Sequence, residues 1–179
     1  MENKAKIVTN KVRFSYANVW QPKSINGGDE KYSVSLIIPK TDKETITRIN
    51  EAVEEAKKAG TAKFGAKFTS GNFKLPLRDG DIDRPDDENY KDSYFVNANS
   101  TTAPGIIDRN KQPILDTTEV YSGCYGRASI VFYPFNSNGN KGIACGLQNL
   151  QKLSDGEPLG GKSRAEDDFD AYEEDDLLS

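Results

Sequence analysis

The sequence contains no histidine and only two cysteines, Cys124 and Cys145. Without an imidazole, the chain cannot supply the base of a Ser-His-Asp hydrolase or the usual ligands of a zinc hydrolase, and two cysteines are too few for a metal-binding quartet. No apolar run approaches the roughly 20 residues of a membrane-spanning helix, and the first residues lack the apolar stretch of a signal peptide. We therefore expect a protein without a membrane segment that keeps both cysteines as thiols in a reducing compartment.

Acidic and basic residues are unevenly distributed along the chain. Residues 165–179 contain eight acids and no base, so all 24 lysines and arginines lie in residues 1–164. The formal net charge of -4 thus combines a basic body with a strongly acidic end. We expect one folded domain over residues 1–153, followed by a linker and a disordered acidic tail over residues 154–179.

Short segments with alternating apolar and polar residues dominate the body. This period of two predicts strands over residues 5–20, 31–40, 94–99, 119–135 and 141–153. Thr41 and Glu44 form a capping box, and apolar residues at helical spacing predict one helix over residues 42–59 that ends at Gly60. The sequence therefore predicts a mainly β fold, an antiparallel barrel of the OB type with one mid-chain helix.

The segment from Tyr125 to Tyr133 shows the clearest alternation. Its small and apolar residues predict a core face, and Tyr125, Arg127 and Tyr133 share the opposite face. Such a face suits unpaired bases that stack on rings and phosphates that need cations, although an ordinary solvated sheet face fits equally well.

The same reasoning extends to other aromatic and basic residues of the body, while most phenylalanines fit a core role. The candidate phosphate contacts are Arg13, Lys67, Lys74, Arg78, Arg109 and Arg127. The candidate stacking residues are Trp20, Tyr94, Tyr125 and Tyr133.

An acidic stretch at residues 79–92 raises the question of a metal site. Asp79, Asp81 and Asp83 have the first three spacings of a calcium loop, but Arg84 stands where glycine is needed and Tyr90 where glutamate is needed. We expect this stretch to be a solvated loop without a metal ion. The sequence predicts no enzyme and no cofactor.

Apolar residues interrupt the acids of the tail. A segment that only aids solubility does not need them, whereas an acidic and apolar segment can dock on a basic groove of a partner or fold back on the basic body. The candidate partner-binding residues are Asp167, Asp168, Phe169, Asp170, Tyr172, Asp175, Asp176, Leu177 and Leu178.

Several long strings of this sequence resemble one family of phage proteins. They are LPLRDGD (75–81), YFVNANS (94–100), VYSGCYGRASIVFYPF (120–135) and GNKGIACGLQNLQKLSDGEPLGG (139–161). They are similar to bacteriophage single-stranded DNA-binding proteins of the OB-fold type, a family formerly known as a domain of unknown function. The resemblance implies binding of single-stranded DNA (ssDNA) without strong sequence preference, in phage replication or recombination, in the cytoplasm of the infected bacterial host.

Two alternatives stay open at this point. In the ssDNA-binding interpretation the acidic tail recruits replication or recombination proteins. The first alternative is a β-barrel virion or host-takeover adaptor that binds a protein partner through its acidic tail and does not bind nucleic acid. The other is a metal-dependent nuclease that uses Asp79, Asp81 and Asp83. A homo-oligomer is compatible with all of these readings.

Overall fold

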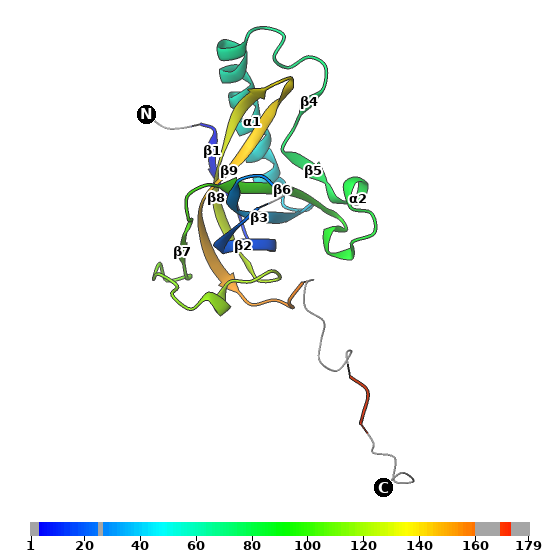
Figure 1. The fold of residues 1–179 in the computed structure, drawn as a ribbon, viewed down its shortest axis with the longest axis vertical. Coiled ribbons are helices and arrows are strands. Elements are labelled where there is room, and N and C mark those ends of the chain that lie inside the picture. Colours follow the sequence, from blue (N-terminus) through cyan, green and yellow to red (C-terminus); the bar gives the residue numbers. More distant parts are fainter. Residues whose placement is uncertain (1–3, 25–26, 160–168, 173–179) are drawn as a thin grey trace.

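The computed structural model of the chain describes residues 4–24, 27–159 and 169–172. One long helix, α1 (Lys43–Phe64), lies beside a strongly curved sheet (Figure 1). The strands of this sheet are β1 (Lys6–Val8), β2 (Val12–Ser24), β3 (Glu30–Pro39), β4 (Phe73–Lys74), β5 (Leu77–Asp79), β6 (Ser93–Ser100), β7 (Gly105–Ile107), β8 (Tyr125–Ser137) and β9 (Asn140–Ser154). Three short helical turns are α2 (Gly80–Asp83), η1 (Glu88–Tyr90) and η2 (Thr117–Glu119). The predicted mainly β fold with one main helix is confirmed.

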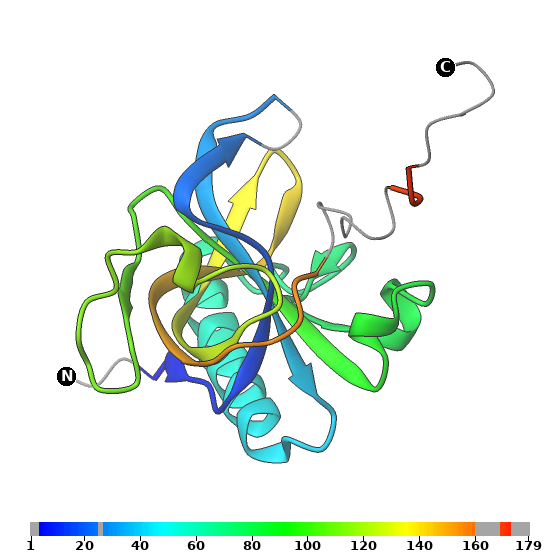
Figure 2. The same ribbon diagram turned by 90° about the horizontal axis from the view of Figure 1, so that it is seen from below.

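The sheet curls because its strands form a ring of neighbours. β8 pairs with β2, β2 with β3, β3 with β6, and β8 with β9, all in antiparallel ladders. The last step, from β6 to β9, is a single parallel pair between Asn99 and Gly146. The strands therefore curl around a core, with α1 along one side (Figure 2). With only this one pair described between β6 and β9, the barrel is not closed there.

The main ladders are antiparallel, as predicted, and the other edge of β9 adds short parallel pairs. There β4, β6 and β7 all run parallel to β9. The hairpin turn after β8 reverses the chain, so β9 runs opposite to β8 and in the same direction as the strands that meet its other edge.

Helix α1 differs from its prediction at both ends. Asp42, rather than Thr41, is the N-cap, and its carboxylate accepts a hydrogen bond from a backbone N–H of the first turn. Gly60 lies inside the helix, which continues to Phe64. A Cβ at Gly60 would lie 2.3 Å from the ring of Phe68. The glycine therefore allows a close approach to that ring and does not end the helix.

Three other segments depart from the sequence prediction. The expected strand 5–20 is divided into β1 and β2, and segment 119–135 becomes a strand only at Tyr125. The acidic stretch 79–92 is not a simple solvated loop, because it contains α2 and η1 and buries Tyr90 completely. Tyr90 packs edge-on against Phe95, with ring centroids 5.0 Å apart, and this contact holds the stretch on the sheet.

The alternation on β8 has the predicted phase. Gly126, Ala128, Ile130 and Phe132 are buried, and the residues between them are partly or fully exposed. Both cysteines are free thiols, as the sequence predicts, and both are buried. Burial raises the pKa of each thiol. Among the helices that the structure describes, none is long and apolar enough to cross a membrane.

Candidate nucleic-acid interface

The side chains on the outer face of β2, β3 and β6 form polar rows across the sheet. Strand pairing places Ser15, Ser35 and Asn97 in one row, and Asn18, Ser33 and Asn99 in the next. Because side chains alternate along each strand, these rows lie on the face opposite the core residues Val34, Leu36, Val96 and Ala98. Ser15 and Ser35 are themselves buried, so the accessible hydroxyl and amide groups of this outer face, which we call the floor, belong to Asn18, Ser33, Asn97 and Asn99.

Two adjoining hollows follow this floor. One, of about 310 Å³, is lined by Tyr16, Arg84, Asn97 and Asn99 among others. The other, also of about 310 Å³, contains Asn99 and extends to Tyr133 on β8. Both are lined by Asn99, so they lie side by side at this residue and together border strands β2, β3, β6, β9 and β8. We call the two hollows together the polar groove.

Tyr16 and Tyr133 present exposed rings to the polar groove. Their exposed fractions are 56% and 42%, although both belong to strands. Tyr16 has a φ of 46°, an uncommon value for a residue other than glycine, and lies where the pairing register of β2 with β3 shifts. This irregularity exposes the ring. Flat exposed rings are the surfaces on which unpaired bases stack.

Arg84 connects Tyr16 to the α2–η1 segment. Its guanidinium lies 5.2 Å from the ring centroid of Tyr16, 5.0 Å from that of Tyr90 and 5.5 Å from that of Phe95. The hydroxyl of Tyr90 donates to the Ser35 hydroxyl at 3.0 Å. The segment therefore borders the polar groove and places a cation beside its exposed tyrosine.

Asp79, Asp81 and Asp83 have the first spacings of a calcium loop, but in the fold they pair with basic side chains. Lys40 Nζ lies 2.9 Å from a carboxylate oxygen of Asp79 and 2.8 Å from one of Asp81. Hydrogen bonding to Lys40 lowers the pKa of Asp81, and the same bonds raise the pKa of Lys40. Asp83 pairs with Arg78 at 3.1 Å. Across the described residues no group of three or more potential ligands could hold a metal ion.

Three cations line the polar groove. Lys23 and Arg84 belong to its first hollow, and Lys31 belongs to its second. Within the part of the chain that the structure describes, none of the three forms an ion pair. Their charges are therefore available to phosphates.

The contact residues predicted from the sequence are spread over the molecule. Tyr133 lines the polar groove. The ring of Tyr94 lies 5.1 Å from Lys40 Nζ, and Arg78 is paired with Asp83. Lys67, Lys74 and Arg109 are exposed, the first two near the β8–β9 hairpin and the third in the loop after β7. Their contact with DNA stays a prediction.

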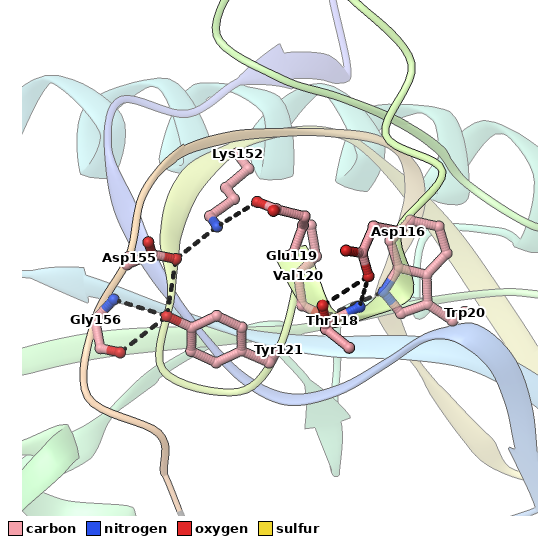
Figure 3. A network of polar contacts seen from close by, with 9 residues as sticks. All are labelled: Trp20, Asp116, Thr118, Glu119, Val120, Tyr121, Lys152, Asp155 and Gly156. Atoms are coloured by element: carbon pink, nitrogen blue, oxygen red, sulfur yellow. Dashed lines mark hydrogen bonds and ion pairs between the residues drawn. The ribbon is translucent and has the colours of Figure 1, made fainter.

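Other predicted residues make contacts inside the protein. Arg13 donates to the carbonyls of Gly123 and Glu157, and Arg127 donates to that of Thr9. The indole of Trp20 donates to the carbonyl of Val120 at 3.0 Å (Figure 3). The ring of Tyr125 lies 5.3 Å from the Arg13 guanidinium. These contacts fix the side chains in place, and their role toward DNA remains a prediction.

Sequence reasoning missed several residues of the polar groove: Tyr16, Asn18, Lys23, Lys31, Ser33, Arg84, Asn97 and Asn99. A signal for some of them was present, because Ser33, Ser35, Asn97 and Asn99 recur with a period of two opposite the apolar faces of their strands. The sequence does not show that β3 and β6 are neighbours in the sheet. The four residues therefore could not be recognised as parts of one surface.

Residues 155–159, which follow β9, are held against the body. The Tyr121 hydroxyl lies 3.0 Å from the Asp155 carboxylate and accepts a hydrogen bond from the Gly156 N–H (Figure 3). Lys152 Nζ lies 2.6 Å from Asp155 and 3.2 Å from Glu119. Hydrogen bonding to Lys152 lowers the pKa of Asp155. Burial alone lowers the pKa of Lys152, but its two carboxylate partners outweigh this effect and raise it.

The end of this segment lies next to the polar groove. Leu159 packs against Ile37, Tyr90 and Phe95, and its N–H donates to the carbonyl of Ser122. Ile37 and Phe95 form the row adjacent to Ser35 and Asn97 on the same face. Leu159, the last described residue before the acidic tail, therefore lies beside the floor of the groove.

The predicted partner-binding residues fall into two groups. Phe169 and Tyr172 are described and are 75% and 89% exposed, and Asp170 is exposed as well. The remaining residues of that prediction, Asp167, Asp168, Asp175, Asp176, Leu177 and Leu178, lie outside the described residues.

Solved structures show the same architecture. The single-stranded DNA-binding protein from bacteriophage Enc34, in complex with ssDNA, is 28% identical and superposes with a TM-score of 0.77, covering 87% of this chain and 90% of that chain. The gp2.5 single-stranded DNA-binding protein encoded by bacteriophage T7 is 15% identical, has a TM-score of 0.62 and covers 91% of both chains, which is a likeness of fold.

Sequence comparisons agree with this architecture. Protein p50 of Acyrthosiphon pisum secondary endosymbiont phage 1 is 31% identical over 185 residues, which cover 97% of this chain and 99% of p50. The family described as Enterobacter phage Enc34, ssDNA-binding protein, matches residues 5–178. The resemblance predicted from the sequence is confirmed, and this chain belongs to the Enc34 ssDNA-binding protein family.

Proposed function

We propose that this chain binds single-stranded DNA in its polar groove during phage DNA replication or recombination, as a binding protein and not as an enzyme. The observation that carries this proposal is a pair of adjoining hollows that combines two exposed tyrosines with three cations that form no ion pair among the described residues. The relatives named as ssDNA-binding proteins support it.

Each part of the groove has a chemical task in this proposal. Tyr16 and Tyr133 stack bases, and stacking accepts any base because every base has a π-face. Lys23, Lys31 and Arg84 neutralise phosphates. A paired base in a duplex does not expose its face, so the tyrosines favour single strands. The amides and hydroxyls of the floor bind the edges of whichever bases enter.

The acidic tail competes with DNA for the same groove. Residues 155–159 hold its beginning beside the groove, and eight acids follow within residues 165–179. A tethered segment has an effective local concentration of about 1 mM, so even weak attraction to the cations competes with DNA. When DNA displaces the tail, its acids and apolar residues bind replication or recombination proteins. The place of action is the cytoplasm of the infected bacterial host.

Fluorescence anisotropy with labelled oligo-dT, duplex DNA and RNA tests this function. We expect the full chain to bind oligo-dT at low salt and to prefer it to duplex DNA, and we expect deletion of residues 165–179 to tighten binding. A folded sample that ignores oligo-dT at low salt, both with and without these residues, would refute ssDNA binding. It would favour the adaptor that acts through its tail.

A further inference from the structure

Another hollow lies on the outer face of β8 and β9, outside the polar groove. It has a volume of about 280 Å³ and lies between β1 and β7. Strand pairing places Val8 beside Ser129, Ser129 beside Asn149, and Asn149 beside Gly105. We call it the β1–β7 hollow. Sites for drug-sized ligands measure about 300–1,000 Å³, so a hollow of this size suits one small flat group and not a folded segment.

Strand β8 connects the β1–β7 hollow to the polar groove. Tyr133 and Val131 line the groove, and Ser129 and Arg127 line the hollow. These four residues alternate with buried ones along the strand, so all four belong to its outer face. From Tyr133 to Arg127 the strand extends about 20 Å, at about 3.3 Å per residue. A DNA strand that leaves the groove along β8 therefore reaches the hollow.

The polar side chains of the β1–β7 hollow offer two donors and one acceptor. Asn149 Oδ1 accepts from the Gly105 N–H at 3.1 Å, which leaves the side-chain NH2 group of Asn149 free to donate. The Ser129 hydroxyl accepts from the Asn149 N–H at 3.1 Å and keeps its own proton to donate. Gln151 donates its NH2 group to the carbonyl of Asp108 at 3.4 Å, which leaves its side-chain oxygen as an acceptor. Thymine complements this set, because its edge carries two carbonyl oxygens and one N–H between them.

The hollow also has aliphatic walls and one cation. Val8, which is 42% exposed, lines it from β1, and Ile107 lines it from β7. The Nε of Arg127 donates to the carbonyl of Thr9 at 2.9 Å, which holds the guanidinium in place and leaves its two NH2 groups to a ligand. Among the described residues Arg127 forms no ion pair. Aliphatic walls suit the faces of a flat ring, and an unpaired guanidinium suits a phosphate.

We propose that the β1–β7 hollow binds one nucleotide of the DNA strand that occupies the polar groove, with thymine as the preferred base. The base lies between Val8 and Ile107. Its two carbonyl oxygens accept hydrogen bonds from Ser129 and Asn149, and its N–H donates to Gln151. The phosphate of this nucleotide pairs with Arg127. This inference rests on the proposed function, because the strand reaches the hollow from the groove.

Oligonucleotide length separates the hollow from the polar groove in titrations of the full chain. OB folds cover about 4–16 nucleotides, so an oligo-dT near the lower limit fills only the groove, whereas one near the upper limit spans groove and hollow. Arg127→Gln should make the slope of log affinity against log salt less steep by about 0.7 for the long oligo-dT and leave that of the short one unchanged. Lys58→Gln is the control for charge, because Lys58 lies on α1 with its side chain 77% exposed.

Asn149→Asp tests the contact with the base. Aspartate keeps an oxygen for the Gly105 N–H but replaces the NH2 donor with an acceptor. We expect long oligo-dT to bind about twofold to tenfold more weakly, because one hydrogen bond to the base is lost, and we expect its preference over long oligo-dC to shrink. Asn50→Asp adds the same charge at an exposed position of α1 and should leave both unchanged.

Val8→Ser tests the aliphatic wall at a position that is already partly exposed, so the core stays intact. We expect long oligo-dT to bind about threefold more weakly and short oligo-dT to bind as before. Leu115→Ser is the matched control, since Leu115 is 88% exposed and does not line the hollow.

The outcomes separate this proposal from the function on which it rests. If the chain binds both oligonucleotides and the three hollow variants bind the long one as the original chain does, the hollow proposal is overturned and the polar groove stands. If the chain binds neither oligonucleotide, both proposals fail. Thymidine monophosphate is the probe for a free nucleotide. If it binds by itself and Val8→Ser abolishes that binding while oligo-dT affinity is unchanged, the hollow belongs to free nucleotides and not to the strand.

Discussion

The Lys31→Gln variant gives a quantitative test of the polar groove. Lys31 is exposed beside Asn99, and with Lys23 and Arg84 it makes up the cations that line the groove in the described part of the chain. Each phosphate neutralised on a single strand contributes about 0.7 to the slope of log affinity against log salt. Three contacts give a slope of about −2, which is a loss of roughly 100-fold in affinity for a tenfold rise in salt. Without Lys31 the slope should fall to about −1.4.

The assay is a series of anisotropy titrations of labelled oligo-dT across a range of salt concentrations. Lys58→Gln is the matched control, because Lys58 lies on α1, its side chain is 77% exposed, and it pairs only loosely with Glu55 at 3.7 Å. The control should keep the slope of the original chain. Both variants remove one positive charge, so any effect of net charge alone appears equally in both.

Two results would refute the reasoning. If Lys31→Gln and Lys58→Gln change the slope equally, the effect belongs to net charge and Lys31 contacts no phosphate. If the original chain shows a slope near zero, phosphates do not bind to the groove cations at all.

Three further predictions concern stacking, packing and pH. Tyr133→Ala should weaken oligo-dT binding by about 1–3 kcal/mol in the same titration, whereas Tyr133→Phe should not, because the ring remains. Gly60→Ala should lower the free energy of unfolding by about 1–3 kcal/mol in denaturant titrations, since its Cβ would overlap the Phe68 ring; an unchanged midpoint would contradict that packing. The folded-state pKa of Asp155 lies below its ordinary value of 3.8. The pair with Lys152 therefore contributes fully to the stability of the fold at pH values above 3.8, and this contribution is lost as the pH falls through the lowered pKa. Fluorescence of the single tryptophan, which contacts the same part of the molecule, should therefore change in acid below about pH 4, and Asp155→Asn should remove that step.

The sequence alone was sufficient for features that depend on short-range periodicity. The alternation from Tyr125 to Tyr133 identified the buried face of β8 because successive side chains of any strand point to opposite sides. Helical spacing likewise located α1, although Gly60 misled the prediction of its end. The separation of basic body from acidic tail needed only counting, and the long shared strings pointed to the family that residues 5–178 match.

The candidate site was decided by the tertiary structure. Ser33 and Asn97 are far apart in the sequence, and only the pairing of β3 with β6 places their rows on one floor. Tyr16 became exposed through a local shift in the register of β2, which periodicity does not reveal. Conversely, the sequence offers Arg127 as a phosphate contact, whereas in the fold its side chain donates to the backbone carbonyl of Thr9. The physical reason is the same in each case: a strand's own geometry sets which side chains share a face, whereas its neighbours depend on hydrogen bonds and packing between distant segments.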